Sequence, residues 1–281
     1  MEGSVRLSFV SASCNKTPRA AAWGSRVLAY GSASHVCVRD PVDPVDNGVR
    51  CVLSGHADRV NAVAMISSQG RDVAIISGSA DSTVRIWLAT ENPFEWTAVS
   101  TPLPHGSSIT AVAVLNAADG DGHVEVAAAS GDAAVTIWRV SLSDGAATKL
   151  QTISLGTKPA LCLAFTRLPC GGRLLAVGGV DRHVRLYAAA AGEAYAAACV
   201  LPGHMDWVSA AQFATMDDGR IMLATGSQDR AIRLWVVGER DAEQGEEAAD
   251  SLLTKMYACY SIIDKLLLFH FLCFLGVFYC V

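Results

Sequence analysis

Histidine and aspartate side chains recur in this chain at matched spacings. Each of two sets holds a Gly-His pair, an aspartate and a tryptophan at the same two intervals: Gly55-His56, Asp81 and Trp87, then Gly203-His204, Asp229 and Trp235. Imidazole and carboxylate groups are common parts of metal sites and of acid–base catalysis. A spacing that repeats this closely also indicates a chain built from copies of one structural unit. A catalytic site and a repeated fold are therefore the two interpretations to separate.

Two incomplete copies lie between the complete sets. Asp132 with Trp138, and Asp181 with Tyr187, keep the interval from aspartate to aromatic residue. The third unit has Pro104-His105 where a Gly-His pair is expected, and the fourth has no histidine there. Successive aspartates are roughly 50 residues apart, against ~40–45 residues for a four-stranded propeller blade. We therefore expect the extra length to lie in loops.

Each unit is predicted to be a small antiparallel meander. A polar, glycine-bearing insert separates two apolar stretches in every unit and indicates a hairpin; these inserts are residues 67–72, 116–123, 169–173 and 216–220. A tighter turn is expected at each repeat aspartate. Residues 111–115 and 160–165 are continuously apolar, as in strands that pack on both faces. Stacked sheets of this kind form an all-β propeller.

The chain resembles the WD40 repeat family, through the Gly-His pairs and the segments that end at Trp87, Trp138 and Trp235. In that family a histidine, a strand Ser/Thr, the turn aspartate and the tryptophan form a hydrogen-bonded network within a blade. The resemblance implies two complete networks: His56, Ser77, Asp81 and Trp87, then His204, Thr225, Asp229 and Trp235. Asp132, Trp138, Asp181 and Tyr187 would be parts of weaker ones. A buried carboxylate needs such donors, which supports a structural role.

Within the WD40 repeat proteins, the chain resembles one particular family. Several features are similar to the second subunit of the Elongator complex. The chain begins with an expected strand at residues 5–14 and a degenerate first blade over residues 23–40, which has Ser34 in the aspartate position. The other similar segments are residues 53–61, 160–165 and 203–208. That family has two seven-bladed propellers and is a scaffold between Elongator subunits, which modify the wobble uridine of transfer RNA and are associated with histone acetylation and transcription. By this likeness residues 1–237 would be five blades of the first propeller, with the clear repeats at 53–237. Two blades and the second propeller would be lacking.

The charge balance does not favour direct nucleic-acid binding. The chain has 22 basic and 27 acidic residues and a net charge of −5, without a run of basic residues. Arg85, Arg185 and Arg233 each follow a repeat aspartate by four residues. They could form a basic patch, but a local salt bridge in the turn or a solvated strand position is favoured. The expected partners are other Elongator subunits, with contact to nucleic acid at most indirect and no small-molecule ligand.

Catalysis, metal binding and cofactor binding are not expected. Nine cysteines occur without a Cys-x-x-Cys pair, and Cys162 and Cys170 are predicted to be buried, reduced thiols. Asp58 and Asp206 suggest paired carboxylates, but the repeat places them on different blades, and His105 and His123 are expected in loops. The sequence shows no phosphate-binding loop or nucleophile elbow, and the apolar stretch at residues 7–10 is too weak to predict a signal peptide. With the family resemblance, this predicts a non-enzymatic protein of the cytoplasm and nucleus.

The composition changes after Trp235. Residues 238–255 are predicted to be an acidic linker, and residues 256–281 a hydrophobic tail unlike the family. The tail has three interpretations: a membrane anchor over residues 262–281, of marginal length; a strand or helix packed on the propeller; or the product of an alternative transcript. Membrane attachment is expected only if residues 262–281 insert. The alternative functions are accordingly a WD40 adaptor in another assembly, such as ubiquitin ligase or chromatin machinery, and a tail-anchored membrane binding protein.

Overall fold

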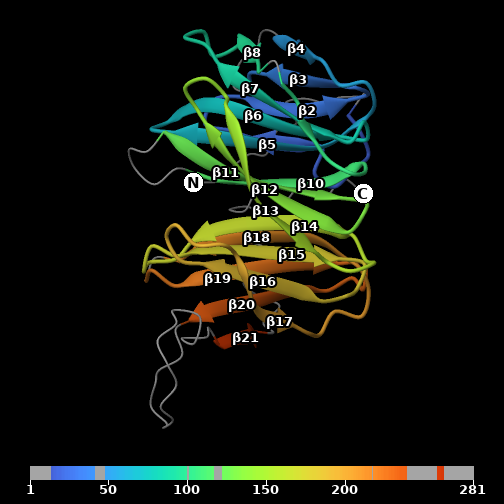
Figure 1. Ribbon diagram of the computed structural model, residues 1–281, viewed down its shortest axis with the longest axis vertical. Helices are drawn as coiled ribbons and strands as arrows, with labels where there is room; N and C mark the ends of the chain where they lie inside the picture. Colours follow the sequence, from blue (N-terminus) through green and yellow to red (C-terminus); the bar gives the residue numbers. More distant parts are fainter. Residues whose placement is uncertain are drawn as a thin grey trace, which may run out of the picture. The chain divides into compact units, whose positions relative to one another are not determined.

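The computed structural model describes residues 14–41, 48–99, 101–116, 122–216, 218–238 and 258–262. All regular elements in these ranges are β-strands, arranged in five antiparallel sheets (Figure 1). The chain divides into two compact units. The first is Met1–Asp132 with Thr136–Lys149, and the second is Ala133–Val135 with Leu150–Val281.

The first two sheets belong to the first unit. Sheet 1 has the order β1 (Ala21–Trp23), β2 (Leu28–Ser32), β3 (His35–Arg39) and β4 (Cys51–Ser54). Sheet 2 has the order β5 (Val60–Ser68), β6 (Arg71–Ser79), β7 (Thr83–Ala89) and β8 (Trp96–Ala98), with β9 (Leu103–Pro104) also paired to β7. The outer strand of sheet 2 is therefore interrupted.

The other three sheets repeat the four-stranded meander. Sheet 3 has the order β10 (Ile109–Leu115), β11 (His123–Ser130), β12 (Ala134–Ser141) and β13 (Ala147–Ser154). Sheet 4 has the order β14 (Ala160–Arg167), β15 (Arg173–Gly179), β16 (Val184–Ala189) and β17 (Ala196–Leu201). Sheet 5 has the order β18 (Val208–Thr215), β19 (Ile221–Ser227), β20 (Ile232–Gly238) and β21 (Ala258–Ile262). These sheets confirm the predicted all-β propeller fold.

The repeat aspartates build the turn between the second and third strands of their sheets. Asp81 Oδ1 accepts the backbone N–H of Thr83 at 2.9 Å, and Asp229 Oδ1 accepts that of Ala231 at 2.8 Å. The residue after each repeat aspartate has a positive φ: Ser82 (64°), Ala133 (60°), Arg182 (67°) and Arg230 (67°). The short aspartate side chain stabilises a turn that would otherwise favour glycine at the next position.

A β-bulge recurs at the second residue of the first strand in sheets 2 to 5. The register shifts fall between Val60 and Ala62, Ile109 and Ala111, Ala160 and Cys162, and Val208 and Ala210. In sheet 2 the bulged residue is Asn61, whose Nδ2 donates to the carbonyl of Ile109 in sheet 3 at 2.8 Å. The bulge thus directs a polar side chain at the neighbouring sheet.

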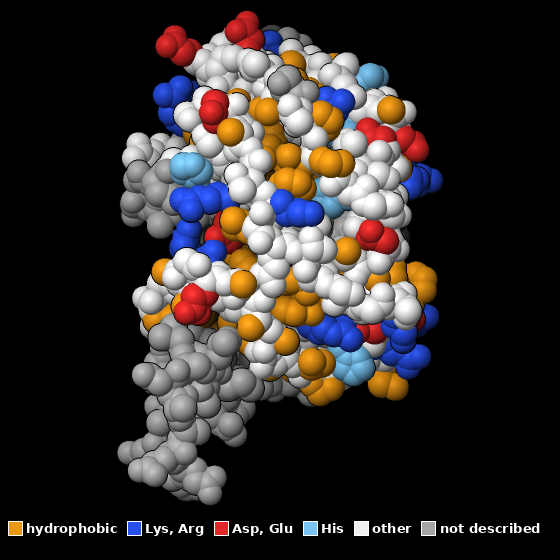
Figure 2. Space-filling model, in the orientation of Figure 1, with side chains coloured by type: hydrophobic (Ala, Val, Ile, Leu, Met, Phe, Trp, Pro, Cys, Tyr) orange, Lys and Arg blue, Asp and Glu red, His pale blue; other side chains and the backbone are white. Residues whose placement is uncertain are grey.

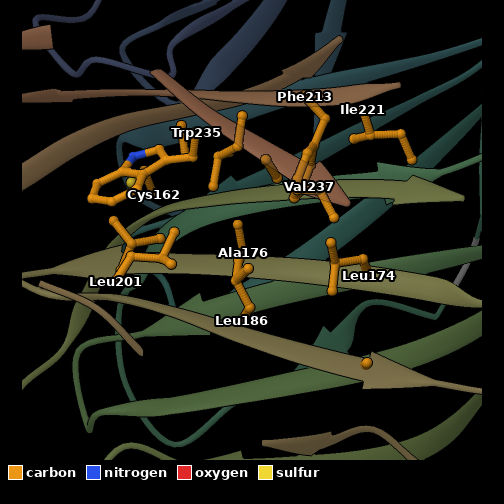
Figure 3. Packing of buried hydrophobic residues seen from close by; sticks show 14 of the residues in the cluster. Cys162, Leu174, Ala176, Leu186, Leu201, Phe213, Ile221, Trp235 and Val237 are labelled. Atoms are coloured by element: carbon orange, nitrogen blue, oxygen red, sulfur yellow. The ribbon is translucent and has the colours of Figure 1, made fainter. Parts of the chain in front are cut away.

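Hydrophobic residues fill the space between adjacent sheets within each unit. Val36 and Val38 of sheet 1 pack with Ile75 and Trp87 of sheet 2. In the second unit, side chains from both faces of the sheet 4–sheet 5 contact converge in Figure 3; they include Cys162, Leu174, Ala176, Leu186, Leu201, Phe213, Ile221, Trp235 and Val237. A single sheet has two apolar faces, so this stacking is what buries them.

A carboxylate in the β5–β6 hairpin joins the first two sheets. Asp72 accepts the backbone N–H groups of Ser25, Arg26 and Val27 at 2.5, 2.8 and 3.0 Å. Those donors form the β1–β2 turn, so one side chain satisfies three N–H groups of the neighbouring sheet. The sequence predicted only that Asp72 belongs to a hairpin insert. Its role depends on the spatial approach of sheet 1, which no local pattern shows.

The fourth strand of sheet 5 lies in the predicted tail. Strand β21 pairs with β20, from Gly238 opposite Ala258 to Leu234 opposite Ile262. The packed-strand interpretation therefore applies to residues 258–262. Gly238, the first residue of the predicted acidic linker, is the last residue of β20. The rest of the predicted linker (239–255), residues 256–257 and 263–281 of the predicted tail, and residues 5–13 of the expected first strand lie outside the described residues.

Two smaller expectations are wrong. Cys170 is exposed, whereas Cys162 is buried, because the insert that carries Cys170 is a surface turn between β14 and β15. His123 is the first residue of β11 and not a loop residue.

The close packing of sheets 4 and 5 makes Gly178 a sensitive position. A Cβ atom there would lie 2.7 Å from Cys162 Sγ and 2.8 Å from Val208 Cγ1. We predict that Gly178→Ala lowers the free energy of unfolding by about 1–3 kcal/mol, measured by urea denaturation. Gly172→Ala is the control, because its nearest contact would be 3.3 Å from Leu168 Cδ1. Equal effects of the two substitutions would contradict the packing argument.

Candidate functional site

The first complete set is assembled from one loop, two strands and a turn of sheet 2. His56 lies in the loop before β5, Ser77 on β6, Asp81 in the β6–β7 turn and Trp87 on β7. His56 and Ser77 are 7% and 0% exposed, and Trp87 is 2% exposed. The structure brings all four side chains together, and we call each complete set a brace.

The hydrogen bonds of this brace run in one direction. His56 Nδ1 lies 2.9 Å from Asp81 Oδ2, and His56 Nε2 lies 2.8 Å from Ser77 Oγ, which also accepts from Trp87 Nε1 at 2.9 Å. A carboxylate can only accept, so we assign the proton of a neutral His56 to Nδ1. Nε2 then accepts from the Ser77 hydroxyl. The chain of donors is tryptophan to serine, serine to histidine, and histidine to aspartate.

The second brace reproduces this geometry in sheet 5. His204 Nδ1 lies 2.9 Å from Asp229 Oδ2, and His204 Nε2 lies 2.9 Å from Thr225 Oγ1. Trp235 Nε1 donates to the same hydroxyl at 3.0 Å. Threonine replaces serine without changing the network, because both supply one hydroxyl at the same strand position.

The surroundings keep both brace carboxylates ionised. Burial is the largest influence on Asp81 and would raise its pKa. Hydrogen bonds from Thr83, the Ala57 backbone and His56 together outweigh it and lower the pKa of the carboxyl to about 2. Asp229 is in the same situation: burial opposes ionisation, but donors that include the backbone of Met205 lower its pKa to about 2.

Burial has the opposite consequence for the imidazole of the first brace. Desolvation is the largest influence on His56 and lowers its pKa, although Asp81 favours the charged form. A neutral ring agrees with the direction assigned to the hydrogen bonds.

The glycine of each Gly-His pair is covered by an arginine from the third strand of the same sheet. Arg233 Nη2 donates to the carbonyl of Gly203 at 2.7 Å, and a Cβ at Gly55 would lie 3.1 Å from Arg85 Nη1. The predicted ion pair within the turn is found for Arg185, which pairs with Asp181. Arg85 and Arg233 instead extend to the loop of the Gly-His pair.

The third unit has a shortened version of the brace. Trp138 Nε1 donates directly to His105 Nε2 at 3.5 Å, and the two rings are edge-to-face with centroids 6.1 Å apart. The position equivalent to Ser77 is Ala128, so no hydroxyl stands between them. Ser130 donates instead to Asp132. The sequence placed His105 at the position of the Gly-His pair, but it did not predict the direct contact between His105 and Trp138.

The fourth unit retains only the turn aspartate of the network. Val177 replaces the strand hydroxyl, and Tyr187 replaces the tryptophan and has no indole N–H. Asp181 pairs with Arg185 in place of a histidine. The two complete sets therefore each form one network: His56, Ser77, Asp81 and Trp87, then His204, Thr225, Asp229 and Trp235. The residues of the incomplete units do not form such a network; they are Asp132, Trp138, Asp181 and Tyr187.

The braces are arranged for stability more than for chemistry. Their imidazoles are buried, and each ring nitrogen already has a hydrogen-bond partner. Asp58 and Asp206 lie in the loops leading to β5 and β18, in separate units. Across the described ranges, no three His, Cys, Asp or Glu side chains are grouped as a metal site would require. A search of the same residues finds no helix with the length and hydrophobicity needed to cross a bilayer.

The comparison with protein families defines the class. The model described as "WD domain, G-beta repeat" matches residues 48–87 and 197–236, and each match contains one complete brace. With the antiparallel sheets of the propeller fold, these matches show that the chain contains WD40 repeats.

Among curated proteins, the chain is similar to relatives named "Elongator complex protein 2". The relative from Danio rerio is 31% identical over 251 residues, which are 87% of this chain and 29% of the relative. The relative from Dictyostelium discoideum is 27% identical over 285 residues, covering 88% and 31%. That from Schizosaccharomyces pombe is 29% identical over 248 residues, covering 86% and 31%. The chain thus spans less than a third of the length of these relatives.

The hydroxyl of Thr225 serves both Trp235 and His204, so its removal leaves two buried groups without a partner. We predict that Thr225→Val, which keeps the side-chain shape, lowers the free energy of unfolding by about 2–4 kcal/mol, measured by urea denaturation. Thr225→Ser keeps the hydroxyl and should therefore retain most of the stability of the unchanged chain. Thr215→Val, at an exposed strand end, is the matched control and should change stability by under about 0.5 kcal/mol. A Thr225→Val protein as stable as the control would refute the brace.

The low pKa values of Asp81 and Asp229 predict a loss of stability in acid. Each carboxyl has a pKa of about 2 in the fold and ~3.9 in the unfolded chain. The stability that each ionised carboxylate contributes at neutral pH is therefore lost as pH falls from ~5 to ~2. The lowered pKa of His56 adds a further loss of stability as pH falls below ~6.5, because this imidazole is protonated more readily in the unfolded chain than in the fold.

Urea denaturation at a series of pH values tests this linkage. Asp81→Asn and Asp229→Asn should each flatten the dependence of unfolding free energy on pH between ~5 and ~3. Asp58→Asn removes an exposed carboxylate from the same loop as His56 and is the control. An unchanged slope in the double variant would show that the brace carboxylates do not govern acid stability.

Proposed function

We propose that this chain is an interaction scaffold of the Elongator complex. The observation that carries the proposal is the similarity to Elongator complex protein 2 from several organisms, which extends over 81–88% of the chain. A likeness of that extent includes the incomplete units as well as the two segments that carry general WD40 features.

The placement of the chemically capable side chains supports a scaffold that is not an enzyme. His56 and His204 are 7% and 5% exposed, and both are engaged in the braces. The surfaces left for function are the loops and outer strands. WD40 blades stacked in this way present such surfaces to partner proteins.

The activity of the assembly is part of the same proposal. As a scaffold of Elongator, the chain would support modification of transfer RNA wobble uridines and the histone acetylation and transcription associated with the complex. Its own contacts would be with protein subunits, and contact with nucleic acid would be indirect, in agreement with a net charge of −5. We propose residence in both cytoplasm and nucleus.

Co-purification tests the assignment. An epitope-tagged chain, expressed in cells of its source organism, should recover the other Elongator subunits, identified by mass spectrometry. Thr215→Val leaves the braces intact and should recover the same subunits, whereas Asp229→Ala, which removes the acceptor of His204, should recover fewer as the fold is lost. Recovery of a different assembly with no Elongator subunit would overturn the proposal.

A further inference from the structure

Four connections of the second unit lie along one edge of its sheets. They are the segments before β14, between β15 and β16, between β17 and β18, and between β19 and β20, at residues 155–159, 180–183, 202–207 and 228–231. Because neighbouring strands are antiparallel, the start of a first strand and the turn between the second and third strands share an edge. We call these four segments the loop edge.

Two large apolar side chains on the loop edge are exposed to solvent. Met205 is 73% exposed and Trp207 is 45% exposed. The second brace uses only the backbone of these two residues: Met205 N–H donates to Asp229, and the Trp207 carbonyl accepts from Gln228. The brace therefore does not require these side chains.

The first brace provides an internal comparison. In its loop the equivalent positions are Ala57 and Arg59, and their backbone groups make the same hydrogen bonds. The repeated structure therefore accommodates a small and a polar residue there. An exposed methionine and tryptophan in the second copy point to a binding surface and not to a requirement of the fold.

Basic side chains surround this apolar pair. Lys158, Arg182, His183 and Arg230 are all exposed on the loop edge. Arg182 and Arg230 each have φ of 67°, a conformation that disfavours long side chains. The corresponding residues of the other two aspartate turns are Ser82 and Ala133. The same turn thus accommodates small residues at this position, so the two arginines are not a requirement of the fold.

The acids of the loop edge are already engaged within the chain and are fewer than the basic side chains that reach it. Asp181 is paired with Arg185, and Asp229 belongs to the brace. Asp206 accepts the backbone N–H of Trp207 through its side chain. Arg185 reaches Asp181 and Arg233 reaches Gly203, so five Lys or Arg side chains meet three carboxylates at the loop edge, which is therefore positive on a chain whose net charge is −5.

Sheet packing places the apolar pair among the cations. Trp207 precedes Val208, which lies against Gly178 at the end of β15, so the β15–β16 turn with Arg182 and His183 is adjacent. The β19–β20 turn with Arg230 is joined to Trp207 by the bond from Gln228. In Figure 2 basic, histidine and apolar side chains gather at the lower right, over the region of strands β14 to β20 in Figure 1.

We propose that the loop edge binds an acidic segment of a partner protein that carries a bulky apolar anchor. Carboxylates would pair with Arg182 and Arg230, since guanidinium groups bind carboxylates through paired hydrogen bonds. The anchor would pack on Met205 and Trp207, because methionine adapts to different partners and tryptophan dominates many interfaces. A methionine beside the tryptophan favours an apolar anchor over a stacked nucleic-acid base.

Fluorescence anisotropy with the full chain tests this binding. The probe is a short fluorescein-labelled peptide in which glutamates flank a central Leu-Phe pair. We expect saturable binding that weakens as salt is added. A Met205→Ser/Trp207→Ala variant and an Arg182→Glu/Arg230→Glu variant should each bind about tenfold more weakly. A peptide with Ser-Ser at its centre should lose affinity to a similar extent.

Arg220→Glu is the matched charge control, because Arg220 lies in the β18–β19 connection at the opposite edge. It should bind the probe as the unchanged chain does, and circular dichroism and thermal melting should confirm that every variant is folded. Absence of saturable binding, equal binding by the loop-edge variants, or tighter binding of a single-stranded oligouridylate at the same residues would overturn the proposal. Since only chain and probe are present, the result is independent of whether the chain co-purifies with Elongator.

Discussion

One buried hydroxyl in each brace connects three parts of a sheet. Ser77 and Thr225 each receive the indole N–H of the third strand and donate to the histidine of the entering loop. That histidine holds the aspartate of the tight turn. Loop, strands and turn are thereby fixed by a network in which every buried polar group has a partner, and such networks specify one arrangement strongly. Loss of the hydroxyl leaves both the indole and the imidazole without a partner.

This dependence explains how the incomplete units differ. Where the hydroxyl is absent, at Ala128 and Val177, the four-residue network does not form. His105 contacts Trp138 directly in one unit, and Asp181 takes an arginine as partner in the other. Each substitution at the strand position is apolar, so no buried hydroxyl is left without a partner. The four residues of a brace therefore behave as a set, and partial sets are replaced by simpler local contacts.

The fold could be predicted because it follows from local spacing, and the members of the braces because the repeats resemble those of the WD40 family. The interval from Asp81 to Trp87 fixes a turn and a strand, and its repetition predicts the stacked sheets. The contacts that were missed join residues whose approach depends on the packing of whole sheets. Asp72 caps a turn of sheet 1, and Asn61 reaches a carbonyl of sheet 3. Nothing in the neighbouring sequence of either residue marks its partner. The exposure of Trp207 is likewise a property of the folded surface.

The fourth strand of sheet 5, β21, is separated from the third strand by a longer stretch of chain than in the other sheets. In sheets 1 to 4 the outer strand follows the third strand after a short connection, whereas the outer edge of β20 is paired only when residues 258–262 are available. During synthesis from the amino terminus, that edge would present unpaired backbone groups for longer than any earlier edge. Unpaired strand edges are the sites at which chains associate wrongly or exchange strands. Sheet 5 is therefore where a nascent chain has most need of protection by a chaperone.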